Sequence, residues 1–313
     1  GGIWGLAILL GGLLVNRSNY YSPLNTELNL ATSPAPGISE SNLLSMDGGT
    51  PTAFPIVYTL MTRVPPDLNA PSTLTPTVLP FYEGPIYAGK SIGGRPIEVF
   101  RLGNGPKAYM LVGGIHGGYE IITSYLIDEI IEYFIWHPAE IPSDTRLYLL
   151  RSLNPDGAQL PYDADGRPNL NGVDLNRNYT EDWAAAWPRE GCWDFRPTHG
   201  GTHPASEPET VALMSFVLEH PLIALVSYHA VAPGFYPAGD PLDPKSHKLS
   251  KDLSDASGYP YPAVETGCKM TGSLVDWVIT TGAAAVDVEL TSHRETDFEI
   301  NLKLVKALLG WLP

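Results

Sequence analysis

The hydrophobic residues between positions 81 and 313 follow two spacings, one typical of β-strands and the other of α-helices. Compact apolar runs predict strands at 96–103, 107–115, 145–153, 223–229 and 283–290. Apolar residues at every third or fourth position predict helices at 120–137, 205–220 and 297–312. Only Asn104-Gly105-Pro106 separate the first two strands, so we expect those strands to be neighbours. Because strands and helices alternate, the pattern predicts an α/β fold with a mixed, mostly parallel sheet flanked by helices on both faces.

The first 80 residues show neither spacing. Residues 1–15 are apolar and uncharged, which is typical of a membrane anchor or of the hydrophobic part of a signal peptide. A buried core helix is the alternative interpretation of that segment. Residues 16–80 are rich in Pro, Ser and Thr, and this composition predicts a linker. We therefore expect an extracytoplasmic protein, secreted or anchored at the N-terminus, with one globular domain at 81–313.

The net charge bears on the class of partner, and the cysteine content bears on disulfide formation. The formal net charge is -15, the opposite of the basic surface that a nucleic-acid partner requires. The two cysteines, Cys192 and Cys268, are too few for a disulfide scaffold. In an exported protein they can form one disulfide, and two free thiols are the alternative.

Polar residues follow several of the predicted strands. His116 comes after the strand at 107–115, His229 ends the strand at 223–229, and Glu289 lies near the end of 283–290. Ligand sites in α/β sheets form at strand ends. A histidine in such a position is often an ordinary hydrogen-bonded residue, but a carboxylate in an apolar strand needs a partner or a chemical role. Asp287 faces the same side of its strand as Glu289, so either acid could have that role.

Seven segments, in this order, resemble the zinc metallocarboxypeptidase family, in its compact, bacterial-type form related to carboxypeptidase A. The segments are GGIHGGYE, NPDG, GRPNLNGVDLNRN, SEPET, SYH, TGSLVDW and VDVEL, and the resemblance covers roughly residues 85–311. It implies the corresponding α/β fold and a catalytic domain at 81–313. NGVDLNRN and VDVEL are its most specific parts.

The resemblance implies a metal site and a catalytic base. His116, Glu120 and His229 would bind one Zn²⁺ and leave a fourth position for water, as catalytic zinc requires. Glu289 would be the general base, which takes a proton from the zinc-activated water and passes it to the leaving amine.

The resemblance also implies a set of substrate contacts. Arg167 would polarise the scissile carbonyl and stabilise the oxyanion. Asn176 and Arg177 would hold the terminal carboxylate of a peptide, and a planar guanidinium suits that ligand. A solvated loop arginine is the alternative interpretation of Arg177. Val275 corresponds to the floor of the side-chain pocket and favours an apolar residue there.

The sequence departs from the family pattern at two places. The usual ligand pair is H-x-x-E, whereas His116 and Glu120 are separated by one more residue. We expect the intervening glycines to accommodate it, the alternative being that Glu120 only caps the following helix. The position of a substrate-capping tyrosine falls on Cys268, so we expect Tyr259 or Tyr261 to replace that tyrosine.

The leading prediction is therefore a zinc-dependent metallocarboxypeptidase that hydrolyses the C-terminal peptide bond of peptides. One alternative is an amidase for cell-wall peptides with diaminopimelate-type linkages, and another is an amidohydrolase for N-acyl amino acids. A third is a surface binding module that keeps the fold but has lost the metal. The combined presence of both histidines, Glu289, Arg167 and Arg177 argues against that third alternative, because costly polar groups cluster at functional sites.

Overall fold

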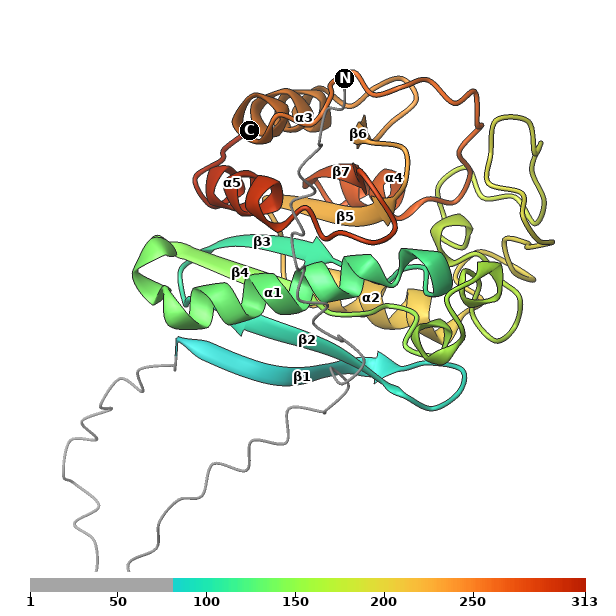
Figure 1. Ribbon diagram of the computed structural model, residues 1–313, viewed down its shortest axis with the longest axis horizontal. Helices are drawn as coiled ribbons and strands as arrows, with labels where there is room; N and C mark the ends of the chain where they lie inside the picture. Colours follow the sequence, from blue (N-terminus) through green and yellow to red (C-terminus); the bar gives the residue numbers. More distant parts are fainter. Residues whose placement is uncertain (1–80) are drawn as a thin grey trace, which may run out of the picture. The chain divides into compact units, whose positions relative to one another are not determined.

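The computed structural model describes residues 81–313, so the predictions for segments 1–15 and 16–80 lie outside the described residues. The strands are β1 (Tyr82–Lys90), β2 (Pro96–Leu102), β3 (Lys107–Val112), β4 (Thr145–Leu150), β5 (Ala224–Ala230), β6 (Gly234–Pro237) and β7 (Ala284–Leu290). The helices are α1 (Ile122–Trp136), α2 (Pro208–Glu219), α3 (Pro244–Ser257), α4 (Leu274–Thr280) and α5 (Phe298–Leu309), as drawn in Figure 1. Each strand and helix that the hydrophobic spacing predicts is present. The spacing does not predict β1, β6, α3 or α4.

The seven strands found within residues 81–313 form one sheet in the order β1-β2-β4-β3-β5-β7-β6. The central strands β4, β3, β5 and β7 are parallel, whereas β1, β2 and β6 pair in the antiparallel sense at the edges. The predicted mixed sheet is confirmed, but it is not mostly parallel, since three of its six strand pairings are antiparallel.

The prediction that the first two strands are neighbours is wrong, because β4 lies between β2 and β3. Strands two places apart are separated by about 10 Å. The four residues 103–106 can span that distance, so a short connection does not require direct pairing.

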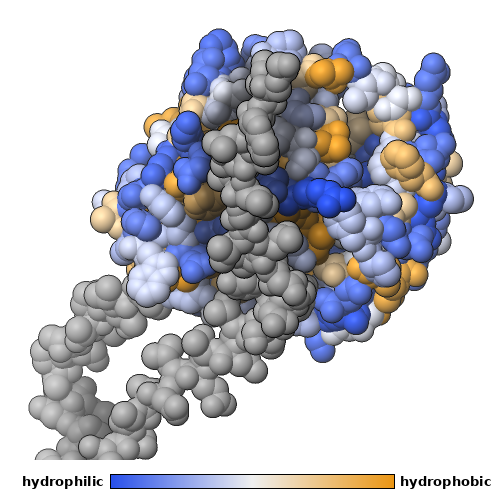
Figure 2. Space-filling view, viewed as in Figure 1, coloured by the Kyte–Doolittle hydropathy of each residue, from blue (hydrophilic) through white to orange (hydrophobic). Residues whose placement is uncertain are grey.

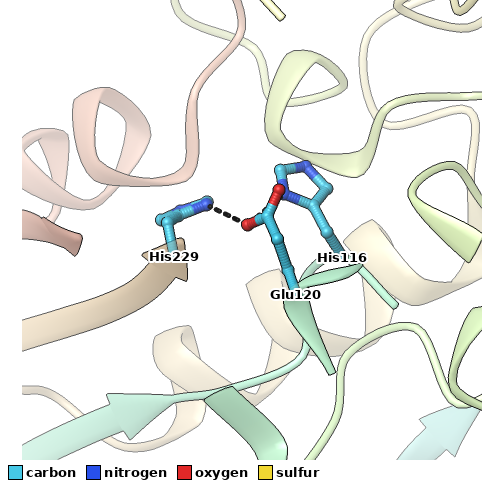
Figure 3. Close-up of side chains that lie close together, drawn as sticks. All are labelled: His116, Glu120 and His229. Carbon is cyan, nitrogen blue, oxygen red and sulfur yellow. Dashed lines mark hydrogen bonds and ion pairs between the residues drawn. The ribbon is translucent and has the colours of Figure 1, made fainter. Parts of the chain in front are cut away.

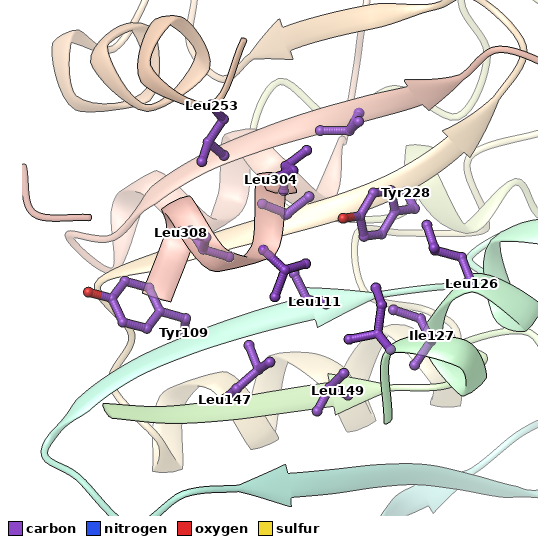
Figure 4. Close-up of a cluster of buried hydrophobic side chains, with 14 of the residues drawn as sticks. Tyr109, Leu111, Leu126, Ile127, Leu147, Leu149, Tyr228, Leu253, Leu304 and Leu308 are labelled. Carbon is purple, nitrogen blue, oxygen red and sulfur yellow. The ribbon is translucent and has the colours of Figure 1, made fainter. Parts of the chain in front are cut away.

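Helices cover both faces of the sheet, as predicted. Helices α1, α3 and α5 pack on one face, and α2 and α4 pack on the other. Figure 4 shows the first of these two hydrophobic clusters, where leucines of α1, α3 and α5 meet side chains of the central strands. Its labelled members are Tyr109, Leu111, Leu126, Ile127, Leu147, Leu149, Tyr228, Leu253, Leu304 and Leu308. Fully burying one such leucine contributes about 1.5–3 kcal/mol, so this packing fixes the ends of the parallel strands firmly.

Alternation along β5 and β7 turns polar residues toward one face of the sheet. On β5, Leu225 belongs to the cluster under α2 and α4, and the next residues on that face are Ser227 and His229. On β7, the neighbouring positions on the same face are Asp287 and Glu289, which pair in register with Ser227 and His229. The hydrophobic face therefore becomes a polar one at the carboxyl ends of these two strands.

The surface of residues 81–313 mixes polar and apolar side chains. On the face drawn in Figure 2, hydrophobic residues are interspersed among hydrophilic ones. Isolated exposed apolar side chains of this kind are normal on globular proteins. Within the described range, no helix has the length and hydrophobicity to span a bilayer.

Candidate metal centre and active site

Three predicted metal ligands meet at the carboxyl end of the sheet. His116 lies in the loop after β3, Glu120 ends a short 3-10 helix (Gly118–Glu120) before α1, and His229 lies near the end of β5. Their ligand atoms are all within 4.8 Å of one another, and all three residues are buried. Figure 3 shows the carboxylate of Glu120 next to both imidazole rings.

The two rings present the same nitrogen to the centre of this cluster. His116 Nδ1 is 3.1 Å and His229 Nδ1 is 3.4 Å from Oε2 of Glu120. The other nitrogens face carboxylates, since His116 Nε2 is 2.9 Å from Asp174 and His229 Nε2 is 3.3 Å from Asp287. Two imidazole nitrogens and one carboxylate oxygen, backed by further carboxylates, are a ligand set that suits catalytic zinc. The donor atoms of this chain therefore fit the metal.

The longer spacing between His116 and Glu120 is accommodated by glycine, as expected. Gly118 has a φ of +57°, which is unfavourable for residues with a side chain. A Cβ at Gly117 would lie 2.3 Å from the backbone of Gly157. The chain can therefore make a tight turn against its neighbour and bring Glu120 back to His116. This is the structural reason for glycines between an imidazole and a carboxylate.

Charged neighbours favour the ionised form of Glu120, which is the form that binds a cation. Burial would raise the pKa of Glu120, but His116 and Arg167 hold it well below its usual range. Burial would lower the pKa of His229, but Asp287 and Glu120 raise it well above its usual range. A divalent cation that binds the His229 ring therefore competes with a proton for it.

Glu289 lies next to this cluster. It pairs in register with His229, and its Oε2 accepts a hydrogen bond of 3.1 Å from the Ala232 amide. Burial raises the pKa of Glu289 to about 7. A carboxyl group with a pKa near neutrality can both accept and release a proton, which is the property of a general base that later acts as an acid.

Arg167 lies beside the metal ligands. Its guanidinium group donates hydrogen bonds to Glu120 and, at 3.1 Å, to Asp174. The Trp193 ring covers the guanidinium at 4.7 Å. The cation is therefore held beside the metal ligand Glu120, and its role in polarising a carbonyl oxygen stays a prediction.

Arg177 is a buried cation without an anionic partner. It is 5% exposed, and within residues 81–313 no carboxylate oxygen lies within 4.0 Å of its guanidinium nitrogens. Its Nη1 donates to the Asn176 carbonyl at 2.8 Å, and the Trp187 ring lies 5.0 Å from the guanidinium carbon. Its Nε has no hydrogen-bond partner. Such a charge is costly to bury, so its arrangement favours an anion supplied by a ligand.

Asn176 and Val275 flank this region. The Asn176 side chain accepts a hydrogen bond from the Leu274 amide at 2.9 Å and lies 3.4 Å from His229 Nε2. Val275 is in the first turn of α4, within the hydrophobic cluster under α2 and α4. Asn176 is therefore fixed beside the metal centre, and the pocket role of Val275 stays a prediction.

The structure does not bring Tyr259 or Tyr261 to the metal centre. Tyr259 is buried in the cluster on the opposite face of the sheet, and its hydroxyl donates to Asp297 at 2.8 Å. Tyr261 packs against the same cluster, with its hydroxyl on His247. The expectation that Tyr259 or Tyr261 binds substrate is therefore wrong, because both side chains pack against the cluster under α1, α3 and α5.

Cys192 and Cys268 form a disulfide, which selects the first of the two alternatives. Arg177 Nη2 lies 3.5 Å from the Cys268 sulfur, and Trp193, which covers Arg167, directly follows Cys192. The bond therefore joins two long loops beside both arginines.

Asp174 is a site residue that the sequence interpretation left without a role. It contacts His116 and Arg167 and is 2% exposed. Burial would raise its pKa, but Arg167 and His116 hold the pKa well below its usual range. Asp174 is the acidic residue of the segment NGVDLNRN, and its place there is the sequence signal that could have identified it as a site residue.

Comparisons with known proteins agree with this geometry. The profile of the zinc carboxypeptidase family matches residues 85–303. Carboxypeptidase D of Mus musculus is 29% identical over 159 residues, which is 45% of this chain and 10% of that protein. Carboxypeptidase A6 of Mus musculus is 28% identical over 247 residues, or 66% of this chain and 55% of that protein. The chain thus spans from a tenth to about half of the length of these relatives.

Solved structures share the fold. Bovine thrombin-activatable fibrinolysis inhibitor, in complex with tick carboxypeptidase inhibitor, aligns with a TM-score of 0.57 and 18% identity over 72% of this chain and 86% of that one. The murein-tripeptide amidase MpaA from Escherichia coli O157 aligns with a TM-score of 0.52 and 24% identity over 76% of this chain and 95% of that one. The family profile covers well over half of the sequence. The chain therefore belongs to the zinc carboxypeptidase family.

Proposed function

We propose that this chain uses one zinc ion to hydrolyse the C-terminal peptide bond of peptides. The observation that carries the proposal is Arg177, a buried guanidinium without an anionic partner in the described part of the chain. It follows directly after Asn176, which contacts the metal ligand His229. A terminal carboxylate is the anion that such a planar cation binds best. Recognition of that group beside the metal centre makes an exopeptidase.

Each group of the site then has a role in the reaction. Zinc, when held by His116, Glu120 and His229, supplies positive charge that activates water and polarises the scissile carbonyl. Glu289 accepts a proton from that water and delivers it to the nitrogen of the leaving residue. Arg167 stabilises negative charge that develops on the carbonyl oxygen.

An amidase that acts on cell-wall peptides is the second candidate. The likeness to a murein-tripeptide amidase, which extends over 95% of that chain, favours it. Such a substrate also ends in a carboxylate, so Arg177 serves both candidates. An N-acyl amino acid amidohydrolase would use the same group. A binding module without catalysis is less well supported, because Glu289 is held at a pKa of about 7 beside a complete ligand set.

Location outside the cytoplasm remains part of the proposal. The disulfide between Cys192 and Cys268 supports it, because such bonds persist in oxidising compartments. The membrane anchor proposed at residues 1–15 could be tested by fractionating cells that produce the chain with and without that segment.

The proposal is tested with the zinc-loaded full chain and a mixture of peptides. The mixture contains free C-termini, matched C-terminal amides and one cell-wall stem peptide, and mass spectrometry reports the residues that are released. We expect single residues to leave the free acids, and Glu289→Gln to release none. Cleavage of the stem peptide alone moves the function to the cell wall. Equal cleavage of acids and amides refutes the role of Arg177.

A further inference from the structure

A second carboxylate, besides Glu289, faces the metal centre from β7. Asp287 lies two residues before Glu289, so both side chains are on the same face of the sheet. The Asp287 side chain is 10% exposed, and the only ion-pair partner within 4.0 Å in residues 81–313 is His229. Burying a carboxylate is costly unless a specific partner compensates for the lost solvation. The contact with His229 is therefore the interaction that compensates for the burial of Asp287.

Three side chains approach Nε2 of His229. Asp287 Oδ1 is at 3.3 Å, Ser227 Oγ at 3.2 Å and Asn176 Nδ2 at 3.4 Å. The amide nitrogen of Asn176 is a donor only, and it points a hydrogen at Oδ2 of Asp287, 3.4 Å away. Ser227 Oγ is hydrogen-bonded to Nε2, whereas Asp287 Oδ1 makes an ion-pair contact with Nε2 and is otherwise a buried oxygen without a hydrogen-bond partner. Asp287 and Ser227 are thus the two candidate acceptors for a hydrogen on Nε2. The carboxylate is the stronger acceptor because it is charged.

The position of this acceptor decides which nitrogen of His229 is available to a metal. When a carboxylate accepts the Nε2 hydrogen, the lone pair of the neutral ring is on Nδ1. Nδ1 is the nitrogen that faces Glu120, at 3.4 Å. His116 has the same arrangement, with Nε2 on Asp174 at 2.9 Å and Nδ1 on Glu120. Both histidines thus have a buried carboxylate at Nε2, which is hydrogen-bonded to His116 and in ion-pair contact with His229.

We propose that Asp287 is a positioning residue that fixes the ring of His229, and its Nδ1 lone pair, for zinc binding. The inference rests on the zinc site of the proposed function and assigns a role to a residue outside the ligand set and the general base. Asp287 acts through His229 and touches neither zinc nor the scissile bond. Loss of such a carboxylate partner typically weakens metal binding by about 10–100-fold.

The test is the zinc affinity of four variants of the full chain, measured by competition with a chromophoric chelator. Asp287→Ala should raise the zinc Kd by about 10–100-fold, and Asp287→Asn, which retains a neutral acceptor oxygen, should raise it less. Ser227→Ala removes the competing acceptor and should change the Kd less than about threefold. Tyr228→Phe, at a buried hydroxyl without a hydrogen-bond partner on the other face of β5, is the matched control and should have no effect. Circular dichroism checks that each variant is folded.

A second measurement needs no variant. Nitrogen-15 NMR of the zinc-loaded wild-type chain should show His229 with a protonated Nε2 and a metal-bound Nδ1. The opposite assignment overturns the proposal. So does a zinc Kd for Asp287→Ala within twofold of the wild-type value, or a loss in Ser227→Ala as large as that in Asp287→Ala. Unchanged zinc binding with an altered preference for the leaving residue would make Asp287 a substrate contact instead. A wild-type chain that binds no zinc refutes both this inference and the proposed function, whereas normal zinc binding in the Asp287 variants refutes this inference alone.

Discussion

The disulfide between Cys192 and Cys268 should contribute strongly to the stability of the domain. The perturbation is the double variant Cys192→Ser, Cys268→Ser. The two residues are 76 positions apart, and closing a loop of that length in the unfolded chain corresponds to about 4.5 kcal/mol at 25 °C in the chain-entropy treatment. A domain of this size shifts its midpoint by about 2–4 °C for each kcal/mol, so we expect Tm to fall by roughly 9–18 °C.

The assays are urea unfolding of the full chain, which gives the free energy of unfolding, and thermal unfolding, which gives Tm. Both are followed by tryptophan fluorescence in the presence of a chelator, so that metal binding does not contribute. Oxidised wild-type protein, reduced wild-type protein and the double variant are compared. Reduced wild-type protein should resemble the double variant, and a reducing agent should leave the double variant unchanged. A loss of stability below about 1 kcal/mol in the double variant would refute the reasoning, because the two loops would then be held without the bond.

Three further predictions concern the site. Glu289→Gln should lower kcat by about 10²–10⁴-fold, because the general base is lost, while zinc stays bound. Peptide hydrolysis and metal content measure these two properties, and a kcat within tenfold of wild type would contradict the role of Glu289. Arg177→Met should raise KM for peptides with free C-termini by at least about 30-fold, since a charged hydrogen-bonded contact is worth about 2–5 kcal/mol. The variant should also lose the preference for acids over amides, and a retained preference would contradict the contact between Arg177 and the terminal carboxylate. The value of kcat/KM should fall as the pH drops through the pKa of Glu289, which is about 7 without metal, because the base must be deprotonated. Bound zinc, being positive, should move this acidic limb to lower pH, and a pH profile of wild-type protein that stays flat from pH 8 to 4 would contradict the assignment.

Much of the fold could be predicted from hydrophobic spacing. The strands of the parallel centre and the helices α1, α2 and α5 have long or compact apolar patterns. Helix α3 does not, because Leu249 and Leu253 are its only buried apolar residues and most of its other residues are polar. Helix α4 has seven residues and β6 has four, which is too short for a period to be recognised. The order of β2, β4 and β3 depends on long-range pairing, which local spacing does not encode.

The site was predictable where the chemistry of a residue is unusual for its position. His116, Glu120, His229 and Glu289 are polar residues at the ends of apolar strands or beside them, and they meet in space. Tyr259 was not predictable, because counting positions along a loop does not show which face of the sheet a side chain joins. The orientation of each histidine also required coordinates, since it depends on residues far away in the sequence. Asp287 is 58 positions beyond His229, the ring that it contacts.

One comparison tests the central claim most directly. A single peptide is prepared as the free acid and as the C-terminal amide, and each is incubated with the zinc-loaded chain and with the chain after chelation. We predict release of the last residue from the acid only, and only with zinc. Cleavage of both forms, or cleavage that survives complete removal of the metal, would contradict a zinc carboxypeptidase that recognises the terminal carboxylate through Arg177.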